Sequence, residues 1–153
     1  MVKPVVYVIA TGGTIASNYV PSNGKLVAPA SADDLVASIP EITEFAEIRS
    51  VQHSNITSDL MDIPTVVGLG KLVRKLLGED NVAAVVITHG TATLEETAYF
   101  LDLTVDQDKP VVLTGAMRNL SERDADGPRN ILYSTMTAVH QESRGRGVLV
   151  CFN

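Results

Sequence analysis

Tryptophan is absent from this chain, and aromatic residues make up only 5 % of its 153 residues. Hydrophobic residues nevertheless make up 45 % of the sequence, so a packed core is expected, built mainly from Val, Leu, Ile and Ala. Cysteine occurs once, as Cys151, which excludes an internal disulfide. Because Cys151 lies in the apolar run GVLVCFN, we interpret it as a buried strand thiol.

Basic residues are too few to balance the acidic ones, since 12 Lys and Arg stand against 18 Asp and Glu for a net charge of -6. Phosphate groups and anionic membranes bind basic surfaces, so we expect neither nucleic acid nor a membrane as partner. No apolar run approaches the roughly 18 residues that a membrane span needs. The N-terminal stretch has no small-residue cleavage site, and we therefore expect a cytoplasmic protein.

Histidine is also sparse, and His53, His89 and His140 are too scattered for a metal-ligand spacing. We expect no metal and no cofactor. The length suits one ordinary domain that spans residues 1–153.

Short apolar runs rich in β-branched residues predict the strands. Most of them are nearly continuous rather than alternating, as in strands buried on both faces of a parallel sheet. They cover residues 5–10, 46–52, 82–88, 110–116 and 147–152. Helical patterns lie between them, at residues 31–39, 61–78, 93–103 and 127–142. This alternation predicts a doubly wound α/β domain, and five strands favour the flavodoxin-like order.

Residues at the helix ends and on one helix face refine these predictions. Ser31 is the expected N-cap of the first helix, and Thr93 with Glu96 is expected to form a capping box at the third. One apolar stripe is expected on the second helix, from Val66, Leu69, Val73 and Leu76.

Small polar residues follow the first four strands, in the segments TGGT, SNITSD, THGTAT and TGAMR. Ligands of open parallel sheets bind beyond the carboxyl ends of the strands. A hydrophobic core does not require Gly, Ser and Thr at these corners, so the sequence predicts a binding or catalytic site there.

The first corner, ATGGTIAS, has two adjacent glycines directly after a strand. Glycine allows positive φ, so successive N–H groups could point at one anionic atom beside the hydroxyl of Thr14. A tight turn with a satisfied threonine explains the pattern equally well. The spacing matches neither the phosphate loop GxxxxGK[ST] nor GxGxxG.

The third corner, THGTATLEE, places Thr91 ahead of a helix N-terminus, whose positive end favours a carboxylate or a developing oxyanion. His89 has no neighbouring Ser or Cys to activate, so we interpret it as a structural hydrogen-bonding residue. Arg118, after the fourth strand, either orients a carboxylate or braces its own loop.

Together, the segments VIATGGTIAS, VVITHGTATLEETAYFLDLT, KPVVLTGAMR, DADGPRN and GRGVLV resemble the type I/II L-asparaginase and glutaminase family in order and approximate spacing. The resemblance implies an amidohydrolase with a small-molecule substrate, built on a flavodoxin-like N-terminal domain. It also implies dimers or tetramers, and a smaller C-terminal domain that we expect this chain to lack.

The resemblance implies that Thr14 is the nucleophile, that Tyr19 activates it and that Thr91 is the second catalytic threonine. A further set is implied to bind substrate, with Ser58 and its neighbour holding the substrate carboxylate: Gly13, Ser58, Asp59, Gly90, Ala92 and Arg118. Asp59 stands where the family commonly has Gln or Glu.

Two departures from the family pattern bear on function. Ala92 replaces the aspartate of the family motif HGTDT, which holds the substrate's α-amino group, and the family's lysine would lie past Asn153. One hypothesis is an enzyme with altered chemistry or substrate, for example a cyclic or N-blocked amide. The others are a split amidohydrolase completed by a second chain, and a non-catalytic protein that binds small carboxylates.

Overall fold

A five-stranded parallel sheet forms the centre of the computed structural model, which describes residues 3–19, 26–27 and 29–153. In spatial order its strands are β4 (Glu47–Gln52), β1 (Val5–Ala10), β5 (Val82–Thr88), β6 (Val111–Thr114) and β7 (Val148–Val150). Every pairing among them is parallel. Counted along the chain, the second strand lies outside the first and the others follow on its opposite side. This order confirms the predicted flavodoxin-like fold.

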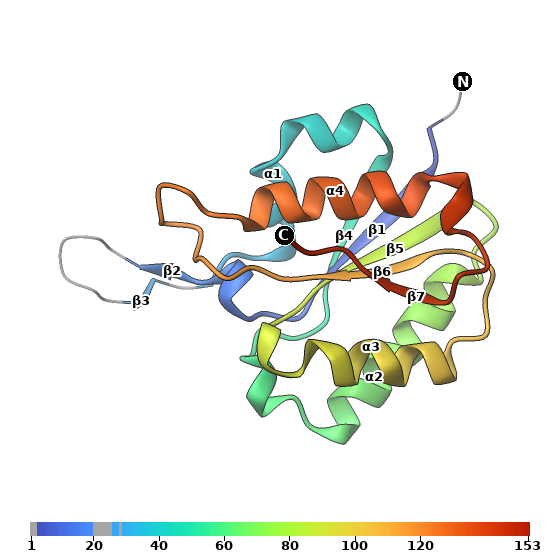
Figure 1. The fold of residues 1–153 in the computed structure, drawn as a ribbon, viewed down its shortest axis with the longest axis horizontal. Coiled ribbons are helices and arrows are strands. Elements are labelled where there is room, and N and C mark those ends of the chain that lie inside the picture. The colour runs from blue at the N-terminus through green and yellow to red at the C-terminus, as the bar shows by residue number, and fades with distance from the viewer. Residues whose placement is uncertain (1–2, 20–25, 28) are drawn as a thin grey trace.

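Helices cover both faces of the sheet (Figure 1). One layer contains α1 (Ala32–Ala37) and α4 (Gly127–Val139), and the other contains α2 (Ile63–Leu77) and α3 (Leu94–Thr104). The predicted last helix was too long at its C-terminal end, because residues after Val139 turn into a separate 3-10 turn, Gln141–Ser143. The sequence patterns did not predict the antiparallel pair β2 (Asn18–Tyr19) and β3 (Leu26–Val27).

The central strands are buried on both faces, which explains why their sequences do not alternate. Along β5, Val85 and Ile87 pack in the core with α2 and α3, while Val86 packs in the core on the α4 side. All three side chains are 0 % exposed. Cys151 departs from its prediction, because it lies just beyond the end of β7 and is only partly buried.

The predicted helix stripe and helix caps are only partly correct. Ser31 does cap α1, accepting from Asp34 N at 3.2 Å while its own backbone N donates to Asp34 Oδ2 at 2.9 Å. The capping box at Thr93 is wrong, because its side chain makes no cap hydrogen bond. Three residues of the α2 stripe are buried, but Val66 is only half-buried and borders a surface groove.

The first three corners of the carboxyl edge each contain a short 3-10 turn. The turns are η1 (Thr14–Ala16), η3 (Ser58–Leu60) and η4 (Thr91–Thr93). They follow β1, β4 and β5, which are neighbours in the sheet, so the fold gathers them at one end of the molecule. None of the helices in the described part of the chain is long and apolar enough to cross a membrane.

Candidate active site

A pocket of about 170 Å³ lies where the three 3-10 turns meet. Its lining residues come from all three corners: Gly13, Thr14, Thr57, Ser58, Asp59, Gly90, Thr91 and Ala92. The fold thus brings together seven residues predicted from the sequence. It adds Thr57, which the sequence analysis missed although it precedes Ser58 in the same polar segment.

The first and third corners touch through glycine. Gly13 has φ 81° and ψ -173°, a backbone conformation that residues with a side chain rarely adopt. A Cβ built on Gly13 would lie only 2.7 Å from Gly90 N, so the two backbones approach more closely than any side chain would permit. This contact sets Thr14 and Thr91 on the same pocket.

The proposed cluster of N–H donors in the first corner is wrong in one respect. Gly13 N donates to Ile56 O at 3.0 Å, so it is already used to hold the second corner against the first. Its positive φ therefore serves the junction of the two corners.

Ser58 ties the second corner to the third. It is 3 % exposed, and its Oγ accepts a hydrogen bond from Ala92 N at 3.1 Å. Its carbonyl oxygen accepts one from Thr93 Oγ1 at 2.8 Å, so the Thr93 hydroxyl is directed toward the second corner. A hydroxyl that accepts one bond still has a proton to donate, so Ser58 can also serve a ligand in the pocket.

The pocket carries little charge. Among the described residues that line it, only Asp59 is ionisable, and its side chain is exposed. Ala92 is exposed as well and presents a methyl group at the mouth of the pocket. A substrate carboxylate would be repelled by the side chain of Asp59, so if Asp59 helps to hold one, it does so through its backbone.

His89 lies behind the pocket wall and is 0 % exposed. Its Nδ1 lies 2.7 Å from Gly90 O, and its Nε2 lies 3.0 Å from Thr97 Oγ1. Burial lowers its pKa below the ordinary value, so the neutral ring is favoured. These contacts agree with the interpretation of His89 as a structural residue that orients the third corner.

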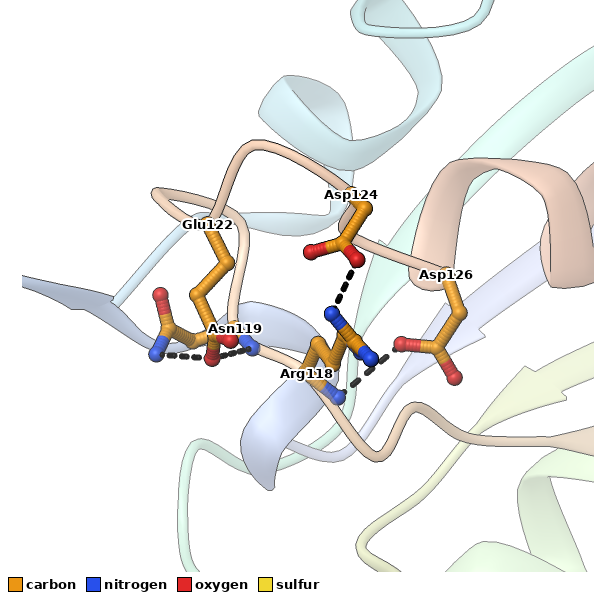
Figure 2. A network of polar contacts seen from close by, with 5 residues as sticks. All are labelled: Arg118, Asn119, Glu122, Asp124 and Asp126. Carbon is orange, nitrogen blue, oxygen red and sulfur yellow. Dashed lines mark hydrogen bonds and ion pairs between the residues drawn. The ribbon is translucent and has the colours of Figure 1, made fainter.

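Of the predicted residues whose side chains the structure describes, Arg118 does not line the pocket. Arg118 is exposed, and its guanidinium pairs with Asp124 in the loop that follows β6 (Figure 2). This geometry supports the bracing alternative rather than direct contact with substrate. The backbone of Tyr19 belongs to β2, but its side chain lies outside what the structure describes.

No group of three or more His, Cys, Asp or Glu side chains that could hold a metal ion occurs within residues 3–19, 26–27 and 29–153. The chemistry that the pocket offers is that of hydroxyl groups, from Thr14, Thr57, Ser58 and Thr91, and of backbone amides.

Comparison with known proteins gives a consistent result. The family model "Asparaginase, N-terminal" matches residues 5–153. L-asparaginase 2 of Bacillus subtilis is 39 % identical over 153 residues, which are 98 % of this chain and 41 % of that protein. Glutaminase-asparaginase of Pseudomonas aeruginosa is 40 % identical over 151 residues, which are 97 % of this chain and 42 % of that protein.

The solved structures agree. A crystal structure of a probable cytoplasmic L-asparaginase from Campylobacter jejuni superposes with a TM-score of 0.92 at 40 % identity, covering 99 % of this chain and 46 % of that one. This chain therefore spans less than half of the length of the relatives that it matches.

Proposed function

Because this chain belongs to the asparaginase family, through the family's N-terminal domain, we propose that it cleaves a small amide by asparaginase-like chemistry with an altered substrate preference. The observation that carries the proposal is the shared pocket: Thr14 and Thr91, from corners 77 residues apart in the sequence, both line it. Tight turns that served only the fold would not need two threonines in the same small pocket.

In the proposed reaction, Thr14 Oγ attacks the amide carbon, and its proton passes to the departing nitrogen as the C–N bond breaks. Water then attacks the resulting ester, releasing the acid and restoring the hydroxyl. Backbone N–H groups at the turns would stabilise the oxyanion of each step. Tyr19 keeps the activating role, and Thr91 the role of second catalytic threonine, that the family resemblance implies.

The substrate proposed for this pocket is an amide without a free α-amino group, such as an N-acylated or cyclic one. Ala92 offers a methyl group where an ammonium would need a carboxylate. An uncharged substituent would lose less binding free energy at this position than a cation, because it has no charge to desolvate.

The test is a panel of amides assayed with the purified full chain: asparagine, glutamine, N-acetylasparagine and a cyclic imide, with ammonia release or ring opening measured. We expect turnover of the blocked or cyclic members, and its loss in Thr14→Ala and Thr91→Ala variants that remain folded. Turnover of free asparagine that disappears in Asp59→Asn would instead show that Asp59 holds the ammonium. Unchanged activity in both threonine variants would refute the assignment.

The same panel separates the proposal from the non-catalytic alternative. A protein that only binds small carboxylates would retain a ligand from the panel without turnover.

We also propose a homo-oligomer in the cytoplasm. The similarity to the Campylobacter jejuni protein, a probable cytoplasmic L-asparaginase, supports that location. A second chain that completes the site stays a prediction. Native mass measurement decides between these assemblies, since an active homo-oligomer would exclude the need for a different partner chain.

A further inference from the structure

The first turn of α4 and the loop before it hold the turn that follows β6. Asp126 is 6 % exposed, and its two carboxylate oxygens accept from Met117 N and Arg118 N, each at 2.9 Å. Asn130, 1 % exposed, donates from Nδ2 to Gly115 O at 2.9 Å and to Asp126 Oδ2 at 3.2 Å. The side chains of Asp126 and Asn130, called the clamp below, thus bond to three consecutive peptide groups of the 115–118 turn.

Figure 2 shows Asp126 of the clamp beside the other polar contacts of the same loop. Arg118 pairs with Asp124 on the exposed side, and Glu122 accepts from Asn119 farther along the loop. Glu122 also accepts from Asn119 N at 3.1 Å, and all of these contacts are exposed and stay within the loop. Asp126 instead lies at the root of the loop, where its carboxylate reaches backbone N–H groups.

The clamped turn packs directly against the third corner of the active-site pocket. A Cβ built on Gly115 would lie 2.8 Å from His89 O and 3.2 Å from Thr91 Cγ2. Gly115 therefore lies beside the backbone before Thr91 and beside the Thr91 methyl group, without room for a side chain between them. Outward movement of the turn would withdraw Gly115 from Thr91 and leave Phe152 as a remaining neighbour on that side.

The carboxylate of Asp126 is a strong hydrogen-bond acceptor for the backbone N–H groups of Met117 and Arg118. Burial raises the pKa of Asp126, but the hydrogen bonds that it accepts from backbone N–H groups outweigh burial and bring the pKa below its ordinary value. The carboxylate thus remains charged, and charge-assisted hydrogen bonds are roughly twice as strong as neutral ones.

We propose that Asp126 and Asn130 are positioning residues for Thr91, acting through the 115–118 turn. Neither side chain lines the pocket, so they make no direct contact with substrate there. They set the position of the Thr91 hydroxyl relative to Thr14. The catalytic part of this inference rests on the proposed amidase function, whereas the structural part does not.

The experiment compares Asp126→Asn with Asp124→Asn in the full chain. Both substitutions remove one negative charge from the same loop, but only the first weakens the bonds to Met117 N and Arg118 N. We expect the Thr91 amide and methyl resonances to move in Asp126→Asn and to stay in place in Asp124→Asn. On the amide that the wild-type chain cleaves, kcat should fall about tenfold to a hundredfold in Asp126→Asn with KM little changed.

Asn130→Ser serves as the second variant if Asp126→Asn does not fold, because it removes the bond to Gly115 O and leaves the Asp126 carboxylate in place. It should move the same Thr91 resonances. A lower melting temperature with unmoved Thr91 resonances in these variants would show a merely structural role and overturn the inference. A wild-type chain that cleaves no amide would refute the proposed function, while the resonance comparison would still test the clamp.

Discussion

Replacing Gly13 with alanine tests the junction that forms the pocket. Gly13 has φ 81° and ψ -173°, in a region that is essentially restricted to glycine, so Gly13→Ala stores strain of roughly 1–3 kcal/mol. The new Cβ would also lie 2.5 Å from Gly90 Cα and 2.7 Å from Gly90 N. Both atoms are backbone, so the corners must separate, and overpacking adds about 1–3 kcal/mol. The sum is roughly 2–6 kcal/mol of the free energy of unfolding.

The chain offers a matched control at Gly145. Its φ is also positive, at 67°, but a Cβ built there meets nothing within 4 Å. Gly145→Ala should therefore cost only the strain of a left-handed residue, about 1–2 kcal/mol. The difference between the two variants measures the contact between the corners.

The assay is equilibrium unfolding in urea, followed by circular dichroism, with the free energy of unfolding extrapolated to water. Gly13→Ala should be the less stable variant, and it should also lose the proposed amidase activity, since Thr14 is its direct neighbour. Equal losses of stability in the two variants would refute the argument that the backbones of Gly13 and Gly90 are in obligatory contact.

Three further predictions concern single interactions. Thr93→Val removes the hydrogen bond to Ser58 O and should lower the free energy of unfolding by about 1 kcal/mol in the same urea assay; no loss would contradict a role in joining the corners. The pKa of His89 is lowered by folding, so its contribution to stability should be complete above the unfolded value of about 6.5 and decline as the pH falls below it. The free energy of unfolding measured as a function of pH should show this decline. The decline should be smaller in His89→Gln, and an equal decline in both proteins would contradict the prediction. Val73→Ala should destabilise more than Val66→Ala, because Val73 is 0 % exposed and Val66 is only half-buried; comparison of their urea midpoints checks this order.

Helix ends show where local sequence patterns stop being sufficient. Ser31 and Asp34 form the capping box at α1 from side chains within one turn of each other, so the local sequence contained the partners. Thr93 and Glu96 have the same spacing, yet Thr93 bonds to Ser58 O, 35 residues away in the sequence. As an N-cap, Thr93 would accept a hydrogen bond from a backbone N–H of its own helix. Its hydroxyl is instead oriented to donate to a carbonyl oxygen of another corner.

The site shows the same division. Thr14 and Thr91 could be selected from the sequence because small polar residues after buried strands are unusual in a core, whereas Ser58 was selected through the family resemblance. Arg118 follows a strand in the same way, but its side chain pairs with Asp124 in the surface loop. Sequence position after a strand fixes the end of the sheet at which a residue lies, and the path of the loop then decides which way the side chain points.

By itself the sequence determined the order of the five sheet strands and the four main helices, the parallel sheet and the family, because these depend on patterns of burial and on motifs that are contiguous in the chain. Only the tertiary structure decided which corners touch. The approach of Gly13 to Gly90 and the tie from Ser58 to Ala92 join segments that the sequence separates. The support that Gly115 gives to Thr91, held by Asp126 and Asn130, is likewise a property of packing. Contacts between distant backbones leave no periodic signal in a single sequence, and that is why the folded chain was needed to reveal them.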